Sequence, residues 1–518
     1  MFDWIIRGGK VIDGTGADPV CADIGVGSEG IEAVGDLSRA EAGKTIDASG
    51  CCVTPGFIDA HSHSDTYLLV EPSAPSKIYQ GITTEIIGNC GASAAPIISK
   101  TQLPFDWQEM SYPGEWHSLR EHLDLLRQCC PAVNVVPLVG HNRIRIGVMG
   151  YEPRPPSGEE MRSMVKKVEE SLDQGAWGLS TGLIYRPGKC ASAAEIAELA
   201  RVVARRNGIY TTHMRSEGDR LLEALEEALA IGLKTGVTVE ISHLKTSGSR
   251  NWPLLDAALD KLADARSRGV NAAADRYPYI SGCTDLDVLL PDWMTDVDRE
   301  TILKRLHAPA QVERFLRENS DRPDDYWKSV IVGTSTEKAW RGRSIHSIAA
   351  EMKASPPETV VAILKQDGLG TQAFFAGMND DNMWKILAQP WVMIGTDASL
   401  RSTRGLLSAD HPHPRAYGTF PKVLRAALDG RTVPLAEAVR KMTSLPAGHF
   451  GIRHRGKLAP GCRADIVVFD PSIVKDLATY ENPHQFSRGI SVVMVNGAVV
   501  LENGKLTGNR PGRVLSPG

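Results

Sequence analysis

Two histidines stand one residue apart in GFIDAHSHSD, at residues 56–65, directly after an apolar run. Because alternate residues of a strand point to the same face, His61 and His63 are expected to project together from a strand end. Two imidazoles placed in this way can bind one metal ion, and zinc accepts such nitrogen donors. The pair alone is weak evidence, since polar residues often follow strands simply because water reaches them there.

Three more candidate ligands end other apolar runs. His213 lies in TTHMRSEG, His243 in EISHLK and Asp397 in IGTDAS. If these runs are neighbouring strands of one sheet, four imidazoles and a carboxylate meet at one edge. Zinc prefers nitrogen and oxygen donors of this kind, with thiolate sulfur where one is present. The sequence therefore predicts a zinc site built from several strand ends.

The elements that must position these side chains are eight strand-like runs separated by helical stretches. The runs cover residues 52–61, 83–89, 134–141, 177–182, 209–214, 237–243, 271–279 and 391–398. Alternating strands and helices favour a parallel sheet, and eight such units close a (β/α)8 TIM barrel with its active site at the carboxyl ends of the strands. Polar residues gather at those ends, and the opposite ends carry no matching set.

The two ends of the chain have a different texture, with short β-rich runs separated by glycine turns. We expect residues 1–55 and 455–518 to combine into one small β-domain beside an α/β barrel domain at residues 56–454. The seventh and eighth runs lie too far apart for one crossover. Residues 284–345 are therefore expected to form an insertion between strands seven and eight, where they could cover the barrel mouth as a lid.

The bulk composition indicates a soluble globular protein. Its 518 residues are 42% hydrophobic and 23% charged with a net charge of -4, which predicts no attraction to nucleic acid or membrane. Apolar runs are too short to cross a bilayer, and the N-terminus lacks the features of a signal peptide, so a cytoplasmic location is expected. Nine cysteines in so long a chain do not indicate a disulfide framework. No oligomeric state is predicted.

The ligand pattern resembles the amidohydrolase superfamily, which carries His-x-His after the first strand, one histidine after each of strands five and six, and an aspartate after strand eight. Most relatives with two metals bridge them with a carboxylated lysine from strand four. The fourth run here, WGLSTGLIYRPG, has no lysine at the barrel mouth. Cys90 in EIIGNCGAS is the expected replacement, because a metal-bound thiol is deprotonated and zinc binds sulfur readily.

The cysteine variant is similar to the D-aminoacylase branch, the N-acyl-D-amino-acid deacylases. The stretches that carry this resemblance are GNCG, GLSTGLIYRPG, HMRSEG, SHLK and HPHPRAYGTFPKVL. The resemblance implies a tighter zinc ion and a second, weaker site, and leaves open whether one ion or two are bound. The tighter site would use Cys90, His213 and His243, and the weaker one His61, His63 and Asp397.

The same resemblance implies hydrolysis of a linear amide in a small-molecule N-acyl-D-amino acid, giving a free D-amino acid and a carboxylate. Zinc would activate water and polarise the carbonyl group. Asp397 would act as general base and then as general acid toward the leaving nitrogen.

A product amino acid implies a substrate carboxylate, which needs cationic or hydroxyl partners. Lys245 follows His243 by two residues, and Arg415 in HPHPRAYG offers two parallel donors. The resemblance adds a tyrosine from DRYPY, either Tyr277 or Tyr279. His141, at the end of the third run, would donate to the substrate carbonyl oxygen or orient its loop.

Two alternatives remain at this point. A cyclic-amide hydrolase of the hydantoinase or dihydropyrimidinase kind shares the barrel and the paired histidines, but uses the carboxylated lysine. A non-catalytic relative that kept the fold for protein interactions would be free to lose ligands, whereas all six candidates are present.

Overall fold

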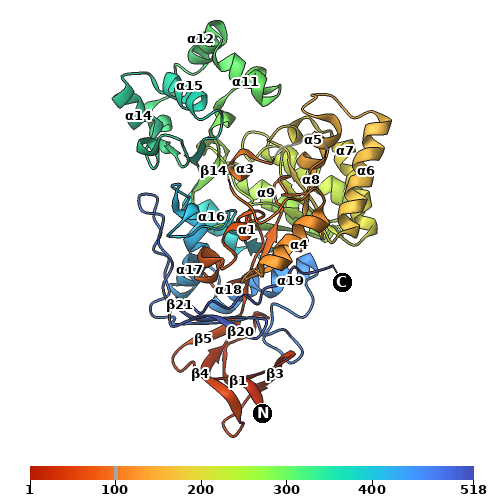
Figure 1. Cartoon of the computed structure of the whole chain (residues 1–518), viewed down its shortest axis with the longest axis vertical. Helices are drawn as coiled ribbons and strands as arrows, with labels where there is room; N and C mark the ends of the chain where they lie inside the picture. Colours follow the sequence, from red (N-terminus) through yellow and green to blue (C-terminus); the bar gives the residue numbers. More distant parts are fainter. Residues whose placement is uncertain (99–102, 109, 518) are drawn as a thin grey trace.

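The computed structural model describes residues 1–98, 103–108 and 110–517 (Figure 1). Its centre is a ring of parallel strands, and each strand overlaps one of the eight expected runs, with β7 beginning one residue before its run. In chain order these are β6 (Phe57–Asp59), β7 (Ile82–Ile87), β8 (Asn134–Pro137) continued by β9 (Val139–Gly140), β10 (Gly178–Gly182), β11 (Ile209–His213), β12 (Thr238–Ile241), β13 (Ala272–Arg276) and β17 (Val392–Ile394).

The ring closes between its first and last strands. The backbone N–H of Ala60 donates to the carbonyl of Ile394 at 3.2 Å, and Ser62 pairs with Ala398 in a parallel bridge. The strands are buried on both faces, and in β7 burial extends to the polar residues of the run ITTEII. The predicted (β/α)8 barrel is confirmed.

Amphipathic helices cover the outside of the ring (Figure 1). Several begin at a serine whose side chain caps the first turn, as Ser118 and Ser157 do in two capping boxes. The helices that follow the strands are α1 (Tyr67–Val70), α2 (Pro75–Ile78), α3 (Phe105–Gln108), α4 (Leu119–Cys129), α5 (His141–Met149), α6 (Gly158–Asp173), α7 (Ala193–Arg205), α8 (Leu221–Thr235), α9 (Leu255–Ser267), α16 (Asp380–Ala388), α17 (Arg415–Leu428), α18 (Leu435–Met442) and α19 (Ser444–Phe450).

Both ends of the chain contribute to a nine-stranded sheet at the lower end of Figure 1. β5 pairs antiparallel with β18, so that Cys52 faces Phe469. This sheet has an apolar cluster of its own, and it supports the proposed division of residues 1–55 and 455–518 from the barrel. Its strands are β1 (Phe2–Val11), β2 (Val20–Gly27), β3 (Gly30–Gly35), β4 (Ala42–Asp47), β5 (Cys52–Pro55), β18 (Ile466–Phe469), β19 (Ile490–Val495), β20 (Ala498–Glu502) and β21 (Lys505–Leu506).

The segment between β13 and β17 is longer than the expected insertion at residues 284–345. It contains a three-stranded antiparallel sheet in which the last strand, β16 (Gln372–Ala376), pairs with both of the others, β14 (Ser281–Asp285) and β15 (Val330–Val332). Residue 345 begins a helix instead of ending the unit. The helices are α10 (Asp292–Thr295), α11 (Arg299–Leu306), α12 (Pro309–Glu318), α13 (Asp324–Ser329), α14 (Ile345–Met352) and α15 (Pro356–Gln366).

This insertion has a separate apolar core, and in Figure 1 it projects from the barrel at the end opposite the nine-stranded sheet. Within the described residues, no helix has both the length and the apolar character needed to span a bilayer.

Candidate metal centre

Five strand ends bring the predicted ligands to one rim of the barrel. The sulfur of Cys90 is the hub: it lies 3.3 Å from His61 Nε2, 3.5 Å from His243 Nε2 and 3.8 Å from His213 Nδ1. One potential ligand atom from each of four residues lies within 4.8 Å of the other three, a spacing that suits metal binding. Those four residues are His61, Cys90, His243 and Asp397.

His63 meets the same cluster through Asp397. Its Nε2 lies 3.2 Å from Asp397 Oδ1, and that oxygen is 3.5 Å from His61 Nε2. The carboxylate therefore faces both histidines of the His-x-His pair, as expected for residues that share one ion. Imidazole, thiolate and carboxylate donors converging in this way fit zinc.

The backbone at three of these positions adopts an unusual conformation. Cys90, His243 and Asp397 have φ of 52°, 36° and 49°, in the left-handed region that residues with a side chain avoid. Each such residue costs on the order of 1–3 kcal/mol and persists only where neighbouring contacts hold it. The N–H of Asp397, for example, donates to the carbonyl of His61 at 2.8 Å. Strain concentrated at three ligand candidates is typical of a functional site.

The electrostatics of the rim favour the ionised forms of two candidate ligands, Cys90 and Asp397. Burial by itself raises the pKa of the Cys90 thiol, but the charge of His61 and hydrogen bonds from His213 and His243 outweigh it and hold that pKa well below its usual value. Burial likewise raises the pKa of Asp397, but the Arg415 guanidinium and the nearby histidines outweigh burial and hold that pKa well below its usual value. The rim therefore presents a thiolate and a carboxylate, both of which are metal ligands.

Two of the expected substrate contacts lie directly against the ligands. Arg415 Nη1 is 2.8 Å from Asp397 Oδ2, and Lys245 Nζ is 2.7 Å from His243 Nδ1. Tyr277 packs beside Arg415, whose guanidinium carbon lies 4.6 Å from the ring centre. The tyrosine hydroxyl is buried and has no hydrogen-bond partner among the described residues.

Tyr279, the other tyrosine of DRYPY, faces a different part of the fold. Its hydroxyl lies against Gly418 of α17: a Cβ atom added to that glycine would be 2.6 Å from the hydroxyl oxygen. The Nζ of Lys422 is 4.0 Å from the centre of the Tyr279 ring. The geometry thus favours Tyr277 over Tyr279 as the partner of a substrate carboxylate.

His141 is completely buried at the start of α5. Its Nε2 lies 2.9 Å from Glu195 Oε1, an oxygen that also accepts a hydrogen bond from Arg145 at 3.1 Å. With one ring nitrogen committed to a buried carboxylate, the geometry favours loop orientation over donation to a substrate carbonyl.

The structure adds three residues that the sequence did not single out for a role. Asp275 Oδ2 lies 3.0 Å from His61 Nδ1, and both side chains are fully buried. Tyr185, in the GLSTGLIYRPG stretch, packs its ring edge on His213 with ring centres 4.9 Å apart. Glu217 lies beside His243 at 2.8 Å. All three stand in stretches already quoted (DRYPY, GLSTGLIYRPG and HMRSEG), but only three-dimensional contacts reveal their partners.

Comparisons with known proteins agree with this site. Residues 44–501 match the model of a family described as "Amidohydrolase family". The chain is 37% identical to D-aminoacylase of Alcaligenes xylosoxydans xylosoxydans, with 99% of this chain and 98% of that protein covered. It is 36% identical to N-acyl-D-glutamate deacylase of the same organism, with 99% and 96% covered.

A solved structure gives the same result. The N-acyl-D-glutamate deacylase of Bordetella bronchiseptica, complexed with zinc and a phosphonate inhibitor that mimics the tetrahedral intermediate, superposes with a TM-score of 0.85. The two proteins are 35% identical, and the match covers 99% of each chain. On its sequence, its fold and the ligand set at its barrel rim, this chain belongs to the amidohydrolase family.

Proposed function

We propose that the protein is a zinc-dependent hydrolase that removes the acyl group from N-acyl-D-amino acids. The observation that carries this proposal is the sulfur of Cys90 within 3.8 Å of nitrogens from three histidines. The strand that would supply a carboxylated lysine, β10, reads GLSTG. A cysteine hub in place of that lysine distinguishes this site from that of the cyclic-amide hydrolases, and the proteins described above that are similar over the full chain are named for deacylation of D-amino acids.

We assign the ligands to two sites that share the cysteine. Cys90, His213 and His243 would hold the tighter zinc ion, and His61, His63 and Asp397 the weaker one. The position of Cys90 Sγ, within hydrogen-bonding distance of histidines from both groups, supports a bridging role. When bound, zinc polarises a substrate carbonyl and lowers the pKa of a coordinated water to about 7.

Asp397 is the proposed proton carrier. Its low pKa keeps it ionised at neutral pH, so Oδ1, which faces His61 and His63, can accept a proton from the attacking water. The same oxygen then returns that proton to the leaving nitrogen as the carbon–nitrogen bond breaks. Water is consumed, and the products are a carboxylate and an amine.

Arg415, Lys245 and Tyr277 are the proposed partners of the substrate carboxylate. The two cations and the hydroxyl lie on the same rim as Asp397, which would fix the amide relative to the base. Arg415 is well suited to this role because its planar donors match a carboxylate in pairs. Tyr185, against His213, would contribute to the wall of the same site.

The substrate is proposed to be a small molecule, with neither nucleic acid nor membrane as a partner. All nine cysteines lie within the described residues and are free thiols. Free thiols, two of them exposed and five partly exposed, are typical of a reducing compartment, which supports a cytoplasmic location.

The test is release of free amine from N-acetyl-D- and N-acetyl-L-amino acids, with apolar and acidic side chains, by zinc-loaded protein. Release from the D series alone is the expected result, and the preferred side chain would describe the pocket. Ring opening of a hydantoin without amine release would transfer the assignment to cyclic amides. No turnover of either class would favour the non-catalytic alternative.

A further inference from the structure

Glu217 occupies a position between the metal ligands and the substrate-binding lysine. Its Oε1 lies 2.5 Å from Lys245 Nζ and 2.8 Å from His243 Nδ1, and its Oε2 lies 3.7 Å from His213 Nε2. The side chain is 12% exposed. One carboxylate thus faces two imidazoles and an ammonium group.

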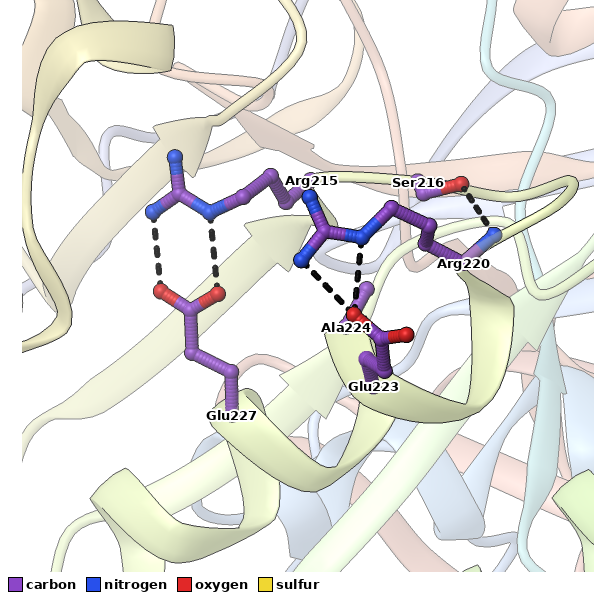
Figure 2. Close-up of a pocket in the computed structure, with 6 residues that line it drawn as sticks. All are labelled: Arg215, Ser216, Arg220, Glu223, Ala224 and Glu227. Carbon is purple, nitrogen blue, oxygen red and sulfur yellow. Dashed lines mark hydrogen bonds and ion pairs between the residues drawn. The ribbon is translucent and has the colours of Figure 1, made fainter.

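The loop that carries Glu217 is held firmly on both sides (Figure 2). Arg215 forms a pair of parallel bonds with Glu227 of α8, Nε to Oε2 at 2.9 Å and Nη2 to Oε1 at 2.8 Å. Ser216 Oγ accepts the backbone N–H of Arg220 at 3.2 Å. A side chain on a loop fixed in this way can hold its neighbours in one geometry.

The carboxyl end of the next barrel strand adds a further anchor. The N–H of Ser247 donates to the carbonyl of Glu217 at 2.7 Å, so this loop is tied to the segment that carries His243 and Lys245. Glu217 therefore connects two neighbouring loops of the rim through its backbone and its side chain.

The two histidines face Glu217 with the nitrogens that do not face Cys90. His213 turns Nδ1 toward the sulfur and Nε2 toward Glu217, whereas His243 turns Nε2 toward the sulfur and Nδ1 toward Glu217. A neutral imidazole that binds metal through one nitrogen carries its proton on the other, and that N–H needs an acceptor. Among the described residues, the buried His213 Nε2 forms no hydrogen bond, and Glu217 is the carboxylate that faces it.

Lys245 depends on the same carboxylate. Its ammonium group touches both Glu217 Oε1 and His243 Nδ1. When Nδ1 carries a proton it cannot accept a hydrogen bond, so Glu217 remains as the anionic partner that holds the ammonium group at the rim. A single residue then sets both the orientation of the ligands and the position of the cation.

We propose that Glu217 is a positioning residue that fixes the metal-binding tautomers of His213 and His243 and holds Lys245 where a substrate carboxylate reaches it. The part that concerns the histidines rests on the metal site alone. The part that concerns Lys245 rests on the proposed function.

The first test compares Glu217→Gln with Asp219→Asn by competition with a zinc chelator, without substrate. Asp219 is a matched control because it lies in the same loop and pairs with the exposed Arg250 instead of a ligand. Glu217→Gln removes the negative charge and replaces one of the two acceptor oxygens by an NH2 donor, which is expected to weaken zinc binding about 10- to 100-fold, the range known for partners of metal-bound histidines. Asp219→Asn should bind zinc like the wild type. Equal zinc affinity in all three proteins would overturn the proposal.

A second, milder variant keeps the test valid if Glu217→Gln misfolds. Circular dichroism would reveal such misfolding. Glu217→Asp keeps the charge but is one methylene shorter, so it cannot reach both rings, and zinc binding weaker than in the wild type is expected. Wild-type affinity in this variant would contradict the shared role.

The second test separates Lys245 from general disturbance of the site. Glu217→Gln is expected to raise KM for the N-acyl-D-amino acid in the wild-type background and to have no further effect on KM in a Lys245→Met background. Independent, multiplicative increases would refute the link to Lys245. If the wild type hydrolyses no acyl amino acid, the proposed function fails, whereas the zinc titration still decides the role of Glu217 at the histidines.

Discussion

Two clusters of buried charged groups lie one beneath the other at the carboxyl end of the barrel, and they are built differently. In the lower one, the ammonium group of Lys77 lies 2.8 Å from Asp59 and 3.1 Å from Glu85, and it donates to Thr396 Oγ1 at 3.0 Å. This cluster contains its own cation. The upper cluster, around Cys90, gathers imidazoles, a thiol and a carboxylate whose donor atoms point to a common centre.

The difference shows how burial of charge can serve the fold or the chemistry. Burial lowers the pKa of Lys77, but Asp59 and Glu85 outweigh that effect and raise it, so the lysine stays charged and the lower cluster pairs its carboxylates with its own cation. Ser62 connects the two clusters: it stands between His61 and His63, accepts a hydrogen bond from Lys77 at 3.2 Å and donates to Glu85. The lower cluster thus holds the strand from which the histidines of the upper cluster project.

The largest effect is expected from Asp397→Asn, which removes the proposed base from the upper cluster. Loss of a general acid and base typically lowers kcat about 10²- to 10⁴-fold. The tighter zinc should remain, because its proposed ligands do not include Asp397. Amine-release kinetics combined with zinc analysis would check this.

Asp429→Asn is the control, since Asp429 pairs with Arg425 at the C-terminal end of α17, where its side chain is half exposed. Unchanged kcat in Asp397→Asn with zinc retained would mean that another group carries the proton.

In the lower cluster, Lys77→Met should act on stability instead of chemistry. Removing the cation leaves Asp59 and Glu85 buried without compensation, which is expected to lower the free energy of unfolding by about 3–5 kcal/mol. Urea unfolding monitored by circular dichroism measures it. The fraction that remains folded should turn over substrate at a rate close to that of the wild type.

Lys261→Met provides the comparison, because Lys261 forms an exposed pair with Glu226. A surface pair of this kind contributes about 0–1 kcal/mol. If both lysine variants lost the same stability, the lower cluster would not be the structural support described above.

Arg415→Lys tests the contact between the upper cluster and the substrate. Lysine keeps the charge near Asp397 but loses the paired donors that match a carboxylate, so KM should rise about tenfold, equivalent to roughly 1.4 kcal/mol. Steady-state kinetics on one N-acetyl-D-amino acid would measure it. A change confined to kcat would instead assign Arg415 to the chemistry of Asp397.

Sequence patterns predicted the barrel, and they also predicted that the candidate ligands would lie together at one rim, for a physical reason. Parallel strands place their carboxyl ends at one rim, so His61, His213 and His243 need only follow apolar runs to be brought together. No long-range contact has to be known in advance. The sequence also predicted that both ends of the chain would form one β-domain, because neither end could bury the faces of a sheet alone.

Other features depend on contacts that a linear pattern does not contain. From the sequence alone, Lys77 in the short segment PSKI would be taken for an exposed lysine. Only the fold places its ammonium group against the carboxylates of Asp59 and Glu85. The proposed role of Glu217 likewise depends on its contacts with Lys245 and His243, which lie in the loop after the next barrel strand. The insertion ran past residue 345 because its last strand pairs with partners far away in the sequence, while its helices have the same amphipathic pattern as those of the barrel.

The smallest effect on KM is expected from substitution of the two tyrosines that the sequence could not distinguish. Tyr277→Phe removes a buried hydroxyl beside Arg415 and should raise KM several-fold, since one hydrogen bond typically contributes about 0.5–1.5 kcal/mol net. Tyr279→Phe should leave KM unchanged, because its hydroxyl lies against Gly418 and away from the ligands. Both variants keep the ring and its packing, so the comparison isolates the hydroxyl group. The reverse result would place the substrate carboxylate beside Gly418 and Lys422 of α17 instead of beside Arg415 at its first residue.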